Sequence, residues 1–108
     1  MIADPADELA RAICVIFVNF AGSATVEKMA SRPWASITFS GARHQFTLRL
    51  QGPSAREATI AFLAGLGERE LSMRGHILAD LAARGDLCEL GEDCVCLGLE
   101  ALTVEEAC

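Results

Sequence analysis

Basic side chains are scarce in this chain, and tyrosine is missing altogether. The 108 residues hold nine basic side chains against fifteen acidic ones, which gives a net charge of -6. Residues 1–54 carry five basic and four acidic side chains, whereas residues 55–108 carry four and eleven. Because contact with phosphate backbones needs a basic surface, we expect no nucleic acid among the partners.

Long apolar runs are also missing. The most apolar stretch, ICVIFVNFAGSAT at residues 13–25, is shorter than the roughly 20 residues that a membrane-spanning helix requires. The segment before it, MIADPADELAR, is net acidic, whereas a secretory signal begins with basic residues. We therefore expect a cytoplasmic protein without membrane contact.

The familiar catalytic motifs are absent as well. The sequence contains no GxSxG, no HExxH and no glycine-rich phosphate loop. The glycines of GLGERE (65–70) follow a predicted helix, where glycine typically ends the helix. The sequence thus favours a non-catalytic protein, and it predicts no cofactor.

The chain has enough apolar material for one folded domain over residues 1–108. Apolar residues make up 52% of it, which argues against disorder. One lysine stands beside eight arginines, and alanine is abundant, which is the usage of a GC-rich bacterial genome.

The first predicted element is an amphipathic helix over residues 5–30. Asp4 followed by Pro5 is a typical helix start, and apolar residues then recur at three- and four-residue steps. The β-branched content of residues 13–20 favours a strand there instead, and the two interpretations stay open. Arg32-Pro33 is expected to end the helix.

A β-hairpin is predicted next, with strands at 34–40 and 45–51 around a turn at 40–43. Ala35, Ile37 and Phe39 alternate with polar residues on the first strand. Phe46, Leu48 and Leu50 alternate with polar residues on the second. The opposite face should carry Trp34 and Arg49 among hydroxyl and amide side chains. Trp and Arg are common anchors at interfaces, so we expect a subunit contact, a small-ligand site or a solvated face there.

The remaining elements are a helix and a second hairpin. Ser54 and Glu57 form a capping-box pattern for a helix at 54–66, with an inward stripe. That predicted stripe consists of Ala58, Ala61, Phe62 and Leu66. Strands are predicted at 70–83, with a bulge at Gly75, and at 94–102, separated by a loop at 84–93 and followed by a short turn from Thr103. The order α-β-β-α-β-β predicts an α+β two-layer sandwich, with a four-stranded antiparallel sheet and the helices on one face.

Cysteine occurs five times, an odd number that argues for reduced thiols over a disulfide framework. Cys94 and Cys96 would share one strand face about 6.6 Å apart, where a disulfide between them is disfavoured. With Cys88 they are candidate metal ligands, although CxC departs from the usual zinc spacing. The alternatives are a redox pair and small apolar residues that pack against another element.

Two histidines and one acid complete the candidate ligand-binding residues, alongside Trp34 and Arg49. His44 and His76 each open a predicted strand. Asp80 would share a strand face with His76, about 13 Å away at roughly 3.3 Å per residue, so the two do not form a catalytic pair by spacing alone. Structural hydrogen bonding and a role in ligand binding both stay open for the histidines.

The second hairpin predicts a partner. Both alternating sets of GHILADLAA and CVCLGLEAL are largely apolar, so this strand pair needs cover on two faces. Two helices cover one face only, and a second copy of the chain is the simplest cover for the other. We therefore expect a homodimeric interaction or scaffold protein, whose sheet contacts a second copy or another protein. The alternative is a small-molecule or metal-binding domain with its site at the dimer cleft.

Overall fold

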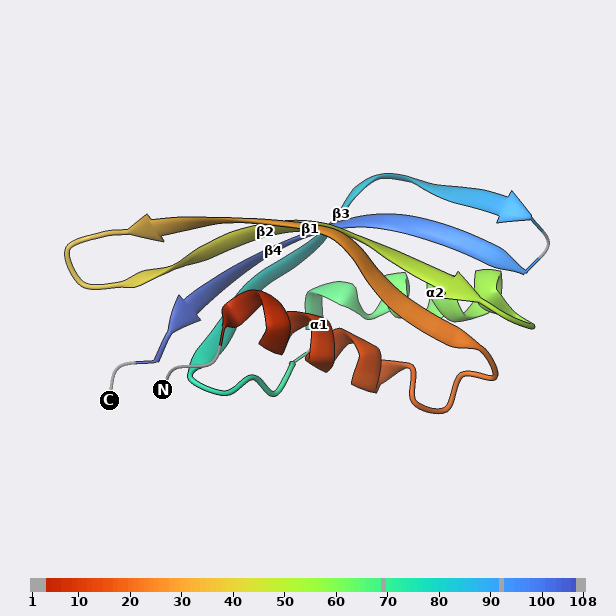
Figure 1. Ribbon diagram of the computed structural model, residues 1–108, viewed down its shortest axis with the longest axis horizontal. Coiled ribbons are helices and arrows are strands. Elements are labelled where there is room, and N and C mark those ends of the chain that lie inside the picture. Colours follow the sequence, from red (N-terminus) through yellow and green to blue (C-terminus); the bar gives the residue numbers. More distant parts are fainter. Residues whose placement is uncertain (1–3, 69, 92, 107–108) are drawn as a thin grey trace.

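The computed structural model describes residues 4–68, 70–91 and 93–106 of the chain (Figure 1). The elements are α1 Pro5–Ile16, β1 Ser23–Ala35, β2 Ser40–Gln51, α2 Ala55–Ala64, a 3₁₀ helix Leu66–Glu68, β3 His76–Gly91 and β4 Cys94–Glu105. The strands form one four-stranded antiparallel sheet, which together with the two helices confirms the predicted α+β class. Within the described residues, no helix has the length and apolar character to cross a membrane.

The sheet runs in the order β1-β2-β4-β3. Each hairpin contributes one edge strand and one central strand, and α2 connects the two hairpins. The central strands β2 and β4 pair along their whole common length, from Gly41 opposite Val104 to Gln51 opposite Cys94. This central pair therefore fixes which side chains of β2 and β4 share a face.

One face of the central pair is buried under both helices, and we call it the inner face. Its side chains are Ala42, His44, Phe46, Leu48, Leu50, Val95, Leu97, Leu99, Ala101 and Thr103. Leu9 and Ile13 of α1 and Phe62 of α2 belong to the same apolar cluster, and Figure 1 shows both helices on the same side of the sheet. The Phe17 and Phe62 rings, 5.3 Å apart, join the two helical segments.

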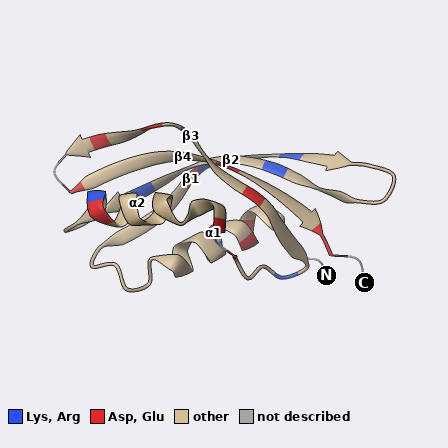
Figure 2. Ribbon diagram, turned by 180° about the vertical axis from the view of Figure 1, so that it is seen from behind, with Lys and Arg blue, Asp and Glu red and all other residues tan. Residues whose placement is uncertain are grey.

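The opposite surface of the sheet, which we call the outer face, carries no helix (Figure 1). The central strands place on it Gly41, Arg43, Gln45, Thr47, Arg49, Gln51, Cys94, Cys96, Gly98, Glu100, Leu102 and Val104. The β1–β2 hairpin extends beyond the helical layer, and Figure 2 shows basic residues along it. The sheet thus has one covered side and one uncovered side.

The helix predicted over residues 5–30 is wrong beyond Ile16, and the competing strand at 13–20 is wrong too. The helix tightens at its end, where Phe17 N–H bonds to the Cys14 carbonyl at 3.1 Å. At Gly22 a Cβ atom would lie 2.1 Å from the Gln51 carbonyl oxygen, so glycine lets the chain turn closely against β2. Phe17, Phe20 and Ala24 have the three- and four-residue spacing of an apolar helix face, but Ala24 belongs to β1.

The first hairpin turns four residues earlier than predicted. Ser36 N–H bonds to the Phe39 carbonyl at 2.7 Å, and residues 36–39 form the turn in place of 40–43. Ile37 is fully exposed and Phe39 is 59% exposed, so the alternation of Ala35, Ile37 and Phe39 does not mark a buried strand face. The alternation predicted for residues 45–51 is correct, and it extends to the start of β2.

The predicted capping box at α2 does not form. Ser54 adopts a left-handed backbone (φ 65°), and its side chain makes no capping hydrogen bond. The buried residues of this helix are Ala55, Thr59 and Phe62, whereas Ala61 is exposed. The helix is therefore rotated relative to the predicted stripe, although its position in the chain is as predicted.

The second hairpin is longer than predicted. Strand β3 begins at His76, after a turn in which Gly75 has φ 73°, so Gly75 does not form a bulge within the strand. The predicted loop at 84–93 is strand as far as Gly91, with irregularities at Leu78/Asp80, Arg84/Cys88 and Glu89/Gly91. Strand β4 continues through Thr103 to Glu105 in place of the predicted turn.

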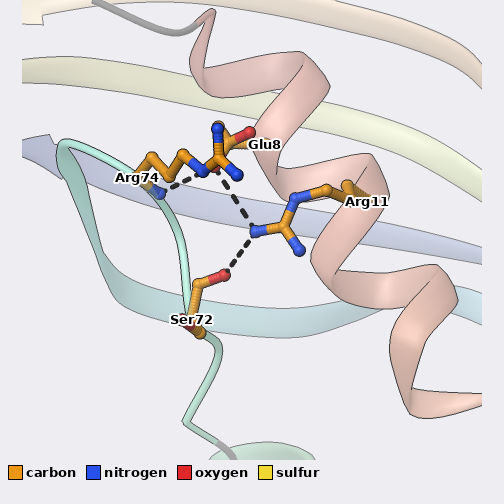
Figure 3. Close-up of polar contacts among 4 residues, drawn as sticks. All are labelled: Glu8, Arg11, Ser72 and Arg74. Carbon is orange, nitrogen blue, oxygen red and sulfur yellow. Dashed lines mark hydrogen bonds and ion pairs between the residues drawn. The ribbon is translucent and has the colours of Figure 1, made fainter.

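Glu8 fastens α1 to the segment that leads into β3 (Figure 3). Its Oε1 accepts a hydrogen bond from the Arg74 backbone amide at 2.7 Å, and Arg11 Nη2 lies 3.4 Å away. Arg11 also donates to the Ser72 carbonyl at 2.9 Å. The amide hydrogen bond and the two guanidinium groups lower the pKa of Glu8 against the raising effect of burial. The first helix is thereby tied to the sheet edge by charge-assisted bonds.

Paired alanine substitutions test the assignment of the faces. Leu48 is buried in the core, so Leu48→Ala is expected to lower the free energy of unfolding by about 2–5 kcal/mol. Ile37→Ala removes a fully exposed side chain and is expected to change it by less than about 0.5 kcal/mol. Urea denaturation followed by circular dichroism measures both. Equal losses in the two variants would contradict the position of the turn at 36–39.

Candidate functional site

His44 lies inside the core at the middle of a chain of hydrogen bonds. Its side chain is fully buried; Nδ1 lies 2.7 Å from Ser31 Oγ and Nε2 lies 2.9 Å from Thr103 Oγ1. Thr103 Oγ1 donates to the Ala42 carbonyl at 3.3 Å, so it accepts from His44, which must carry its proton on Nε2. Ser31 then donates to Nδ1. Both ring nitrogens are satisfied by hydroxyl groups.

This arrangement pairs a serine hydroxyl with a neutral imidazole, which is also the pairing of nucleophile and base in hydrolases. In such enzymes a further group orients the base, and a cleft admits the substrate. Here the orienting group is the Thr103 hydroxyl, and the imidazole of His44 has no exposed surface. Burial lowers the pKa of His44; Asp4 opposes the shift and His76 adds to it. We interpret this series of hydrogen bonds as a structural network that joins β1, β2 and β4.

The other predicted ligand-binding residues do not converge with His44. His76 is buried at the start of β3 on the inner side, opposite Glu105. Asp80 is exposed and lies opposite Leu102 on the outer face. The irregularity between Leu78 and Asp80 removes the expected alternation, so the prediction that His76 and Asp80 share a face is wrong.

Trp34 and Arg49 lie on the outer face but near opposite ends of it. Trp34 is opposite Gly41, and Arg49 is eight residues further along β2, about 26 Å away at roughly 3.3 Å per residue. Arg49 forms an ion pair with Glu27, whose Oε1 lies 2.8 Å from Arg49 Nε. The indole N–H of Trp34 is buried and has no hydrogen-bond partner in the described part of the chain. The five residues therefore do not form a single binding site.

The three cysteines lie together on the outer face, at the end that includes Arg49. Cys88 and Cys96 are direct partners across β3 and β4, and Cys94 is two residues along β4. All three are free thiols. In residues 4–68, 70–91 and 93–106, no group of three or more histidine, cysteine, aspartate or glutamate side chains is arranged to hold a metal ion.

A shallow hollow of about 240 Å³ opens on the outer face between β1, β2 and β4. Its lining residues are Ala30, Ser31, Arg32, Arg43, Gln45 and Glu100. Arg32 and Arg43 are direct cross-strand partners, and neither takes part in an ion pair with the described residues. Like charges directly opposite on neighbouring strands repel one another, so this pair favours a nearby acidic group, and Glu100 of the same chain also lines the hollow.

Comparisons with family models, with curated proteins and with solved structures find no match for this chain.

Several of these contacts could not be found from local spacing. Ser31 and Thr103 lie 13 and 59 residues from His44 in sequence, and Cys88 was predicted to lie in a loop. One signal was available for His44 itself. The two-residue alternation of Phe46, Leu48 and Leu50 extends back to His44 and places it on the buried face.

The buried imidazole predicts a pH-dependent stability. Because the folded pKa of His44 is lowered, the unfolded chain takes up a proton below pH 6.5 while the folded chain does not. The free energy of unfolding should therefore fall as pH decreases from 6.5, by up to about 1.4 kcal/mol per pH unit. Chemical denaturation between pH 7.5 and 5 measures this slope. His44→Gln keeps donor and acceptor groups but does not titrate, so an undiminished slope in that variant would refute the assignment.

The cross-strand thiols predict a specific disulfide. Directly opposite residues of an antiparallel pair lie about 4.5–5.5 Å apart at Cα, within the range of a disulfide. With glutathione disulfide as oxidant, Cys88 and Cys96 should each lose a proton and together pass two electrons to it, leaving two glutathione thiols. Peptide mapping should find this link in the Cys94→Ser variant and not in Cys88→Ser. A predominant link from Cys94 to Cys96 would contradict the register.

Proposed function

We propose that this chain is a non-catalytic interaction protein that works as a homodimer, with the outer face of the sheet as its contact surface. The observation that carries the proposal is the composition of β4. Five of its six outward residues are apolar or small, namely Cys94, Cys96, Gly98, Leu102 and Val104, and only Glu100 is charged. The helices lie on the other side, so these side chains have no second layer of their own chain above them.

The size of the outer face supports a stable contact. Strands β2 and β4 have 12 residues each. Four strands spaced by about 4.8 Å, with a rise of about 3.3 Å per residue, give a face of roughly 760 Å². A standard protein interface buries about 800 Å² on each partner. The face is thus large enough for one specific partner of the same kind.

Trp34 adds a second line of support. It is the single tryptophan of the chain and lies at one end of the outer face, with its indole nitrogen buried and lacking an acceptor among the described residues. Tryptophan is enriched among the residues that dominate binding energy, and a buried indole normally finds a partner. A subunit on this face would cover the part of the Trp34 side chain that the single chain leaves exposed.

The location that fits this proposal is the cytosol. The cysteines at 14, 88, 94 and 96 are free thiols, two of them exposed. Thiols persist in the reduced form where glutathione and thioredoxin act. An oxidising compartment would favour the cross-strand disulfide of β3 and β4 instead.

A small anionic ligand is the second candidate, favoured by the hollow between Arg32 and Arg43. The two candidates differ in solution. A monomer that binds inorganic phosphate or a simple dicarboxylate, and loses this binding in Arg43→Gln, would favour the ligand site. A dimer without such binding favours the interaction protein.

A charge in the centre of the contact tests the dimer. Leu102→Arg places an unpaired cation on the outer face, and burial of such a charge costs several kcal/mol. We expect the dissociation constant of the dimer to rise at least about thirtyfold, measured by sedimentation equilibrium and light scattering. Ile60→Arg makes the same change on the helical layer, where Ile60 is exposed, and should leave the dimer intact. A wild-type protein that stays monomeric at micromolar concentration rules out the proposal.

A further inference from the structure

The strand register arranges the outer face in rows that cross the sheet in the order β1, β2, β4, β3. One row contains Arg32, Arg43, Leu102 and Asp80. Another contains Glu27, Thr47, Gly98 and Arg84. In each row the two edge residues have opposite charges, and the sign pattern reverses from one row to the other.

Resting on the proposed function, we infer that the second copy docks in one particular orientation, related to the first by a twofold axis that runs along the strands over the seam between β2 and β4. Such a rotation keeps each row at its level and exchanges the two edges of the sheet. Arg32 of one copy then lies over Asp80 of the other, and Glu27 lies over Arg84. Each contact occurs twice in the dimer, and every one of these edge contacts joins opposite charges.

The same rotation matches side-chain size at the end of the face that holds Trp34. There the row is Trp34, Gly41, Val104 and Ile77. Trp34 comes to lie over Ile77 of the second copy, which is 53% exposed in the single chain. Val104 comes to lie over Gly41, which has no side chain. Closer to the axis Gln45 lies over Glu100, so an amide donor meets a carboxylate. On either side of this row Arg43 lies over Leu102 and Arg49 over Cys96, so the charge matching of this orientation comes from the sheet edges.

The main alternative is a twofold axis that is also parallel to the sheet but perpendicular to the strands. Placed on the row that contains Gln45 and Glu100, it brings Arg32 over Glu27 and Asp80 over Arg84 of the second copy, so its edge contacts also join opposite charges. However, it stacks Glu100 on its own symmetry mate, which places two carboxylates together without a cation between them. Repulsion between like charges in a contact costs several kcal/mol, so the axis along the strands is favoured.

A charge-exchange experiment separates the two orientations. Arg32→Glu and Asp80→Arg each create two like-charge contacts per dimer, and each variant alone should dimerise at least about tenfold more weakly than wild type. In an equimolar mixture, the new glutamate of one variant lies over the new arginine of the other. The unchanged Arg32 and Asp80 meet at the second contact. The mixture should form heterodimers with a dissociation constant within about threefold of wild type.

Native mass spectrometry distinguishes heterodimers from homodimers, and sedimentation equilibrium gives the constants. Both substituted residues are exposed, so the variants should fold, which circular dichroism checks. Glu57→Arg, on the exposed surface of α2, makes the same charge change outside the contact and should dimerise like wild type.

Each outcome has one meaning. Restored dimerisation in the mixture, after weak dimerisation of each variant alone, supports the orientation. If the wild type is a dimer but the mixture stays dissociated, the axis along the strands is wrong and the proposed function stands. If the wild type is a dimer and the single variants dimerise as tightly, the orientation is again wrong. A monomeric wild type refutes the proposed function and this inference together.

Discussion

The pairing of β2 with β4 is the constraint on which the rest of the structure depends. Because successive side chains of a strand point to opposite faces, this one register decides the direction of every residue of the two central strands. It buries Phe46, Leu48, Leu97 and Leu99 under the helices, and it leaves the alternate residues on the uncovered side. A shift by one residue would exchange the two sets, so the core and the proposed contact surface are specified by the same hydrogen-bonded ladder.

The elements that sequence patterns predict well are those with one continuously buried side. Strand β2 alternates cleanly, α2 lies where the spacing indicates, and β4 begins where predicted. The errors lie on the edge strands β1 and β3, where most residues are exposed and irregularities interrupt the period. Lys28, with φ 55°, lies at such an irregularity inside the segment predicted as helix. A strand without a buried face does not need alternating apolar and polar residues, so its sequence pattern does not reveal it.

The candidate site was less predictable than the fold, because its contacts depend on the register between distant strands. Candidate residues could be chosen by chemical type, but His44 and Asp80 belong to opposite faces, and one irregularity in β3 separates Asp80 from His76. The partnership of Cys88 with Cys96 depends on residues 84–91 being strand, where turn-forming residues suggest a loop. Sequence spacing gives the distance between residues of the same strand, but it does not give the register between different strands.

The two central strands differ in what they place on the outer face, and folding alone does not require this difference. Strand β2 carries Arg43, Gln45, Thr47 and Arg49 there, as a solvated sheet face would. Strand β4 could carry polar residues at the same depth, yet it carries Leu102 and Val104 and two cysteines. Apolar groups on the uncovered side add nothing to the core beneath the sheet. Their presence is best explained by a second layer on that side, and the opposed charges at the two sheet edges suit a second copy of the same face.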